Sequence, residues 1–300
     1  MHLPPLVIVG QSVQSTVWRA VLLCGLGLFA LIARPAPDEA TQLRAQHLAL
    51  AQQLTSNSFG RPLVLESRQT SGEVAGDVFA VLDAPFAAVR DSLSEPGNWC
   101  EIMLLHLNNR RCQVRLSGTR PALAIELGKK VGASLVDTFK LNLDFGLQTR
   151  SSDYLAVHLV AADGPLGTHD YRVVLQAVSL PSGQTFVHLG YAYGYGLSAR
   201  LAMQAYLLTV GHNKVGFSLQ SADAAARPVT GMRGAVERNT MRYYLAIEVF
   251  MATRELPAQA QLPRRWQAWF EATENYHRQL HEMDLESYLS MKRQDRQAAR

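Results

Sequence analysis

The chain has 300 residues, 48% of them hydrophobic, which is the composition of an ordinary globular protein with a sizeable core. Its formal net charge is +4, and its 29 Lys and Arg residues are scattered without forming a basic stripe, so nucleic acid is not an expected partner.

The first feature along the chain is an uncharged apolar segment at residues 20–33, which directly follows Arg19. A segment of this length is short for a membrane-spanning helix and is typical of the core of a signal peptide. The residues after it form only a fair cleavage site, so an uncleaved anchor remains the alternative. We therefore assign residues 1–36 to a signal peptide or membrane anchor. We expect a protein that is periplasmic, or anchored to the inner membrane and facing the periplasm.

Three cysteines are present, and Cys24 belongs to the apolar segment. Cys100 and Cys112 are then left as a pair. In an oxidising compartment two such cysteines are expected to form a disulfide. The alternative is two unpaired buried thiols.

The next region begins with helical spacing of leucines over residues 38–55, which predicts a helix within a helical lead-in at 37–60. Residues 63–82 predict two strands around a turn at 71–72. A helix is expected from residue 84 to the Pro-Gly pair at 96–97, and the apolar segment 99–109 is expected to pack as a short helix or strand.

Alternating apolar and polar residues then predict a series of strands, which is typical of a sheet buried on one face and wet on the other. The predicted strands cover residues 111–117, 121–129, 136–150, 153–161, 171–180 and 184–196. In the last strand the inward set contains Leu189, Tyr191 and Tyr193. A helix is expected at 198–210, and residues 212–220 are expected to return as a final strand.

A long helix is predicted over residues 228–251, where apolar residues recur at steps of three and four, with a gap at Asn239 and Thr240. The Arg and Glu residues of this helix are expected on a solvated flank with i,i+4 pairing. The remaining tail, residues 256–300, predicts a helix that packs on the domain and frays after Met291. Within it, His277 and His281 lie four residues apart, as in zinc sites, but no third ligand is evident. We interpret them as solvated histidines and predict no metal site.

Two segments resemble parts of the START-like superfamily, also called SRPBCC. Residues 76–102 (GDVFAVLDAPFAAVRDSLSEPGNWCEI) are similar to its strand-to-helix step, and residues 231–251 (GMRGAVERNTMRYYLAIEVFM) occupy the place of its gripping helix. The resemblance implies an α+β helix-grip fold over residues 61–255. In that fold a curved antiparallel sheet wraps around a long C-terminal helix, and here extra N- and C-terminal helices are added. It also implies an internal cavity for a lipid, sterol or polycyclic ligand.

The sheet and the long helix together are predicted to line this cavity with Phe139, Leu141, Leu143, Leu189, Tyr191, Tyr193, Val236, Asn239, Tyr243 and Ile247. The leading hypothesis is that the protein binds a lipid or other apolar small molecule there, for transfer or sequestration, with membrane association through the N-terminal segment. The alternative is an enzyme that resembles polyketide cyclases or aromatases and uses the same cavity. No catalytic residue is assigned, and no cofactor is expected.

Overall fold

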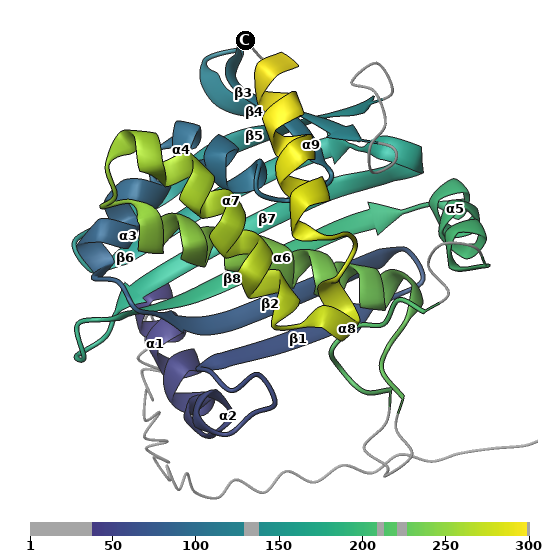
Figure 1. The fold of residues 1–300 in the computed structure, drawn as a ribbon. Helices are drawn as coiled ribbons and strands as arrows, with labels where there is room; N and C mark the ends of the chain where they lie inside the picture. Colours follow the sequence, from purple (N-terminus) through teal and green to yellow (C-terminus); the bar gives the residue numbers. More distant parts are fainter. Residues whose placement is uncertain (1–37, 129–137, 209–212, 221–226, 299–300) are drawn as a thin grey trace, which may run out of the picture. The chain divides into compact units, whose positions relative to one another are not determined.

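An antiparallel sheet of eight strands organises the chain (Figure 1). The computed structural model describes residues 38–128, 138–208, 213–220 and 227–298, and residues 37–300 form one compact unit. The predicted leader at residues 1–36 lies outside the described residues. Within the described ranges, no helix combines the length and the apolar character needed to cross a membrane.

The strand order is β1-β2-β8-β7-β6-β5-β4-β3, so the last strand returns to pair with the second. The strands are β1 Leu63–Gln69, β2 Glu73–Leu82, β3 Asn109–Ser117, β4 Arg120–Gly128, β5 Thr138–Arg150, β6 Tyr154–Asp163, β7 Thr168–Ser179 and β8 Thr185–Tyr195. The short 3-10 helix η1, Pro165–Gly167, connects β6 to β7, and α5, Leu197–Leu208, follows β8.

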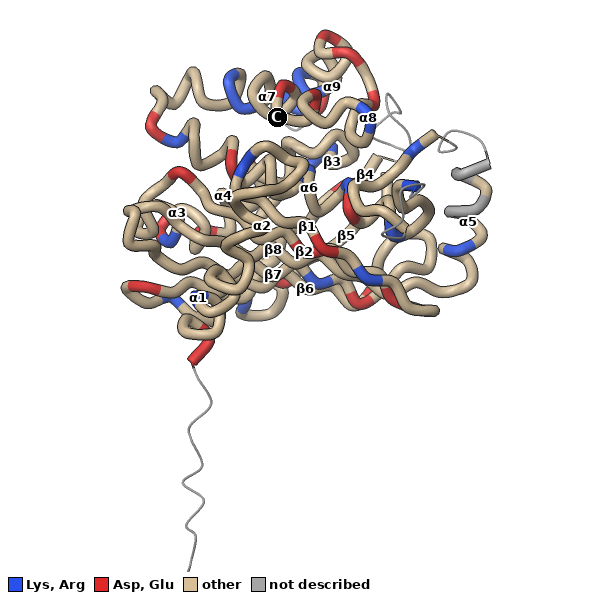
Figure 2. Tube along the Cα trace, turned by 90° about the horizontal axis from the view of Figure 1, so that it is seen from below, with Lys and Arg blue, Asp and Glu red and all other residues tan. Residues whose placement is uncertain are grey.

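One face of the sheet, the inner face, is covered by the long helix α6, Gly231–Thr253, and by two short helices, α3, Phe86–Leu93, and α4, Pro96–Met103. The C-terminal helices α7, Ala258–Glu274, α8, His277–Leu280, and α9, Leu285–Ala298, pack on α6 and on neighbouring elements. The outer face carries α1, Glu39–Ala49, and α2, Ala51–Thr55. Figure 2 shows α7–α9 and α1 on opposite sides of the sheet, with basic and acidic segments interspersed.

This arrangement confirms the predicted helix-grip α+β fold, and it follows from the alternation in the strands. Val187, Leu189 and Tyr191 of β8 point into the main core, whereas Phe186 joins a second apolar cluster under α1. The predicted helices at 38–55 and 84–96 and the predicted strands at 63–82 are present with small shifts in their ends. The ambiguous segment 99–109 contributes the second half of α4 and the first residue of β3.

The long helix α6 differs from the prediction in its surroundings. It is buried on nearly all sides, because the sheet covers one side and α7 and α8 cover the other. Its charged residues Glu237, Arg238 and Arg242 are therefore buried, not solvated as we predicted. Arg233 and Glu237 do form the expected i,i+4 ion pair, at 3.9 Å.

Two further predictions were wrong. Among residues 213–220 the structure has only an isolated bridge, Leu219 to Pro228, where we predicted a strand. The backbone N–H groups of Phe217 and Ser218 instead donate to the buried Glu237 carboxylate, at 2.6 and 2.9 Å. Helix α9 also continues past Met291, since its last turns are held by buried polar contacts of Lys292 and Asp295.

Two local features draw the elements together. Cys100 of α4 and Cys112 of β3 form the predicted disulfide, with Cα atoms 5.3 Å apart. Gly76 of β2 lies directly under α6, where an added Cβ would come within 2.5 Å of the Thr240 hydroxyl. A glycine at this position therefore permits close approach of the helix to the sheet.

Candidate functional site

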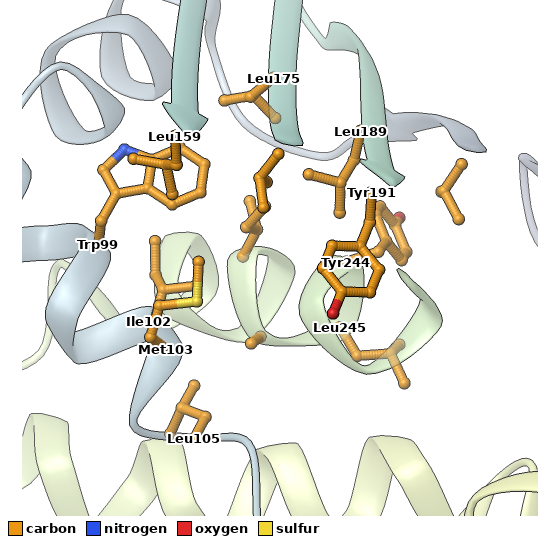
Figure 3. Close-up of a cluster of buried hydrophobic side chains, with 14 of the residues drawn as sticks. Trp99, Ile102, Met103, Leu105, Leu159, Leu175, Leu189, Tyr191, Tyr244 and Leu245 are labelled. Atoms are coloured by element: carbon orange, nitrogen blue, oxygen red, sulfur yellow. The ribbon is translucent and has the colours of Figure 1, made fainter. Parts of the chain in front are cut away.

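The space between the sheet and α6 has two ends of different character. At the end near α4, Trp99, Ile102 and Met103 point towards the strands (Figure 3). They meet Leu159 and Leu175, and all five side chains are at most 2% exposed. We call this the aliphatic end, and it is filled by its own side chains.

The other end, close to η1 and α5, holds four tyrosines that we call the tyrosine cluster: Tyr171 of β7, Tyr191 and Tyr193 of β8, and Tyr243 of α6. The rings of Tyr171 and Tyr193 stack with centroids 5.2 Å apart. Tyr191 packs edge-on against Tyr243, with ring centroids 5.6 Å apart, so the sheet and the helix are in contact here through aromatic rings.

The hydroxyl groups of the tyrosine cluster are not equally paired. Tyr171 shares a hydrogen bond of 2.8 Å with the Thr168 hydroxyl. The Asn109 side chain lies near the Tyr243 hydroxyl and acts to lower the pKa of Tyr243. Tyr191 and Tyr193 are 9% and 6% exposed, and neither hydroxyl has a hydrogen-bond partner within the part of the chain that the structure describes.

Burial also sets the protonation of these phenols. It raises the pKa of Tyr191 well above its usual value, and it is the main cause of the raised pKa of Tyr193. Burial raises the pKa of Tyr243 to about 12, against the opposing effect of the Asn109 side chain. All three phenols therefore remain protonated at neutral pH and can donate a hydrogen bond.

His106 borders the tyrosine cluster, and its ring stacks on that of Tyr243 with centroids 5.0 Å apart. Its Nδ1 accepts a hydrogen bond from the Asn108 backbone N–H at 3.1 Å, and its Nε2 lies 3.4 Å from Asn239 Oδ1. Burial, followed by the charges of Arg242 and Lys292, lowers the pKa of His106 well below its usual value. The ring is therefore neutral, with its proton on Nε2.

Lys292 of α9 closes the same region from the far side of residues 104–109. Its buried ammonium donates to the carbonyl groups of His106, at 2.8 Å, and Asn109, at 3.0 Å. Burial lowers the pKa of Lys292 to about 7. One turn further on, Asp295 forms a buried ion pair with Arg110, so the C-terminal helix fixes the segment that positions His106.

The residues predicted from the sequence to line a cavity belong to this inner space. Leu141, Leu143 and Ile247 are buried in the main core, and Phe139 and Asn239 are half-buried. Tyr191 and Tyr243 do come together, although their rings are in contact where we expected a partly empty space. That the full set lines a ligand cavity stays a prediction; its members are Phe139, Leu141, Leu143, Leu189, Tyr191, Tyr193, Val236, Asn239, Tyr243 and Ile247.

Sequence reasoning missed Tyr171 and His106. Tyr171 begins an alternating apolar set that continues through Val173 and Leu175, so the period of the strand could have placed it on the inner face. Nothing in the sequence indicated that His106, which follows α4 in an apolar segment, would stack on a tyrosine of α6.

A separate recess of about 240 Å³ lies on the outer face, between α1 and the sheet. Its polar wall includes His188, whose ring contacts Asp77 at 2.8 Å and Gln176 at 3.0 Å. Gln176 in turn donates to the Tyr154 hydroxyl at 2.7 Å. The ring nitrogens of His188 are thus both engaged by protein groups, and the lining combines polar side chains with Leu43 and Phe79.

Known proteins give the following comparisons. No family model matches the chain, and no curated protein matches it. Among solved structures, human StAR-related lipid transfer protein 5 is 9% identical, with a TM-score of 0.31, over 56% of this chain and 88% of that one. Norcoclaurine synthase from Thalictrum flavum is 14% identical, with a TM-score of 0.32, over 50% and 80%. The aromatase/cyclase ZhuI from Streptomyces sp. R1128 is 9% identical, with a TM-score of 0.31, over 69% and 95%.

Identities and TM-scores of this size say nothing about what the chain binds. The fold is established by this chain's own strand order and by the long helix held against the inner face. On that basis the described domain has the α+β helix-grip arrangement, an antiparallel sheet with a long helix held against its inner face.

Proposed function

We propose that this domain binds an apolar small molecule carrying at least one hydrogen-bonding group, at the tyrosine cluster between β7, β8 and α6. The observation that carries the proposal is the pair of largely buried phenols Tyr191 and Tyr193, whose hydroxyls have no protein partner within the described residues. Neither hydroxyl is among the fully enclosed unpaired atoms of the described residues, so each is free to donate to water or to a ligand. A ligand oxygen could accept both bonds.

The surroundings favour an apolar body for this ligand. Leu141, Leu143 and Val236 are buried in the same core, and the four aromatic rings of the tyrosine cluster offer flat apolar surface. Burying such a ligand would contribute about 25 cal/mol per Å² of apolar area. Because the rings of Tyr191 and Tyr243 touch, binding requires those rings to separate, and a planar or narrow molecule needs the smallest movement.

Exposed apolar residues support access from the end near α5. Leu166 of η1 and Leu197 and Leu201 of α5 are 57%, 71% and 56% exposed. The Ser198 hydroxyl ties the two elements together by donating to the Leu166 carbonyl at 3.3 Å. These leucines place apolar surface beside the tyrosine cluster, where an apolar molecule would pass between a membrane or carrier and the interior.

The enzyme alternative, a cyclase or aromatase with the same site, would need a group that exchanges protons with the ligand. His106 is the nearest titratable candidate. Its Nδ1 lone pair is already occupied by the Asn108 N–H, and the charges around it oppose protonation. We therefore favour binding for transfer or sequestration.

The binding proposal is tested with the purified full chain. Mass spectrometry of organic extracts would identify co-purified lipids, and titration with the fluorescent probes cis-parinaric acid and dehydroergosterol would measure affinity. The double variant Tyr191→Phe/Tyr193→Phe should weaken binding of at least one probe by about tenfold or more, because it removes two hydrogen bonds that each contribute about 0.5–1.5 kcal/mol. The matched control is Tyr195→Phe, on the same strand and face, because the Tyr195 hydroxyl already donates to the Thr70 carbonyl at 2.7 Å.

Two results would contradict the proposal. One is the absence of both saturable probe binding and a co-purified apolar molecule. The other is equal loss of affinity in the double variant and in Tyr195→Phe, which would indicate a general loosening of the fold. Turnover of a polyketide-like substrate by the wild type would instead favour the enzyme alternative.

We further propose that the protein works in the periplasm, cleaved or anchored to the inner membrane. The apolar segment at 20–33 and the disulfide between Cys100 and Cys112 support an oxidising compartment. A reporter fused after residue 60 should be exported, and the mass of the mature chain would distinguish cleavage from anchoring. Retention of the reporter in the cytosol would contradict the proposal.

A further inference from the structure

Three side chains with metal-binding atoms meet where α7 ends and α8 begins. Glu274 is the last residue of α7, His277 is the first residue of α8, and His281 caps the end of α8. One ligand atom from each lies within 4.8 Å of the other two. We propose that Glu274, His277 and His281 bind one late first-row divalent metal ion, with Zn²⁺ as the natural candidate.

The individual distances fit a site that closes around an ion. His281 Nδ1 lies 3.0 Å from both carboxylate oxygens of Glu274, and His277 Nε2 lies 3.8 Å from Glu274 Oε2. The two imidazole rings are stacked with centroids 4.2 Å apart. In a tetrahedral site with bonds of about 2.0–2.1 Å, neighbouring ligand atoms lie about 3.3 Å apart. Metal binding would therefore bring the three ligand atoms closer together and turn the two stacked rings so that a nitrogen of each points at the same ion.

The backbone of this junction is already held in place. Arg242 of α6 donates to the Leu280 carbonyl at 3.1 Å, and Lys214 donates to the His281 carbonyl at 2.6 Å. On the other side Tyr276 packs edge-on against Phe59 and Phe217, with ring centroids 6.0 and 5.6 Å apart. The ligands are thus carried by a turn whose position does not depend on the metal, which lowers the cost of assembling the site.

The chemistry of the donors selects the class of ion. Two imidazoles and one carboxylate suit Zn²⁺, Cu²⁺ or Ni²⁺, whereas Ca²⁺ and Mg²⁺ prefer oxygen ligands alone. The neighbouring Glu282 is not a fourth ligand, because Arg242 and Lys214 already engage its carboxylate, at 2.8 and 3.0 Å. His277 is 68% exposed, so the remaining positions face water.

The test uses the full chain without a histidine tag. Calorimetric titration with ZnCl₂ should show one ion bound per chain, and Co²⁺ should give the visible absorption of a site with nitrogen ligands. His277→Ala should weaken Zn²⁺ binding by about 100-fold, since even losing a group that only orients a ligand costs 10–100-fold. Glu274→Gln, which keeps the side-chain shape, should weaken it in the same direction.

The matched control is His169→Ala. His169 also lies beside a carboxylate, with Nδ1 2.8 Å from Asp170 Oδ2, and it too is exposed, but within the described residues it belongs to no group of three metal-binding side chains. This variant should bind Zn²⁺ like the wild type. Zn²⁺ should also raise the melting temperature of the wild type and of His169→Ala, but not that of His277→Ala.

Equal binding by the wild type and His277→Ala would overturn the proposal, as would binding that does not saturate at one ion per chain. Either result would show solvated histidines that adsorb metal nonspecifically. Because His277 is largely exposed, its replacement should leave the fold intact, and circular dichroism of the metal-free protein checks this. None of these outcomes bears on ligand binding at the tyrosine cluster.

Discussion

The two ends of the inner space share one sheet and one helix, yet their side chains differ in packing and in hydrogen bonding. At the aliphatic end, the apolar side chains of Ile102 and Met103 of α4 fill the space against Leu159. At the tyrosine cluster, the corresponding surface carries phenols, two of which have no hydrogen-bond partner among the described residues. The first end gains stability from packing, while the second gives up some stability in exchange for donors that a ligand can use.

The largest difference between the two ends should be seen when a substitution creates a cavity at the aliphatic end and lowers the free energy of unfolding. Ile102→Ala should lower the free energy of unfolding by about 2–5 kcal/mol, because Ile102 is fully buried and its neighbours can relax only in part. Denaturant unfolding measures this loss. Probe affinity at the tyrosine cluster should be unchanged, and a parallel loss of affinity would show that the ends are not independent.

The disulfide should have the next largest effect, since it ties α4 of the aliphatic end to β3. Cys100 and Cys112 are 12 residues apart, and a loop of this size stabilises by about 3 kcal/mol. Replacing both by Ser should lower the melting temperature by several degrees. Thiol labelling of denatured, unreduced protein should find neither cysteine free, and labelling of both would contradict the pairing.

The contrast between hydrogen-bonded and unpaired tyrosine hydroxyls can also be tested by pH, because α6 carries a tyrosine whose hydroxyl is hydrogen-bonded. Tyr244 donates to Glu248 at 3.1 Å, and burial raises the pKa of Tyr244 to about 12, from 10.0. The stability that this shift contributes is fully present below pH 10 and is lost as pH rises through 12. At about 1.4 kcal/mol per pKa unit, the loss is about 3 kcal/mol.

In the variant Tyr244→Phe, the part of the stability loss at alkaline pH that comes from Tyr244 should be absent. Chemical denaturation at several pH values between 9 and 12 would measure it, because this range includes the pKa of Tyr244 in the unfolded chain, 10.0, and reaches its pKa in the folded protein, about 12. An unchanged slope in the variant would show that Tyr244 titrates normally in the folded protein.

The smallest stability effect is expected where the phenol is unpaired. Tyr191→Phe removes a hydroxyl without a partner in the described structure, so its stability should change by no more than about 1 kcal/mol. Tyr195→Phe breaks two hydrogen bonds, to the Thr70 carbonyl and from Gln69, and should destabilise more. The opposite ranking would mean that the Tyr191 hydroxyl is bonded in the native protein.

The sequence by itself determined most of the strands and helices of this fold and the faces of its strands. The period of two in β8 placed Tyr191 and Tyr193 inward and Phe186 outward, because only one choice of face buries the larger apolar set. The cysteine count predicted the disulfide, and the spacing of apolar residues predicted the long helix itself.

Only the tertiary structure decided which polar groups find partners. Glu237 and Arg242 look like solvated helix residues in the sequence, but α7, α8 and residues 213–218 cover them and supply backbone partners. The same packing leaves the Tyr191 hydroxyl unpaired among the described residues and brings Glu274 to His281. Hydrogen bonding depends on distances of a few tenths of an ångström between segments far apart in the chain, and local periodicity carries no information about those distances.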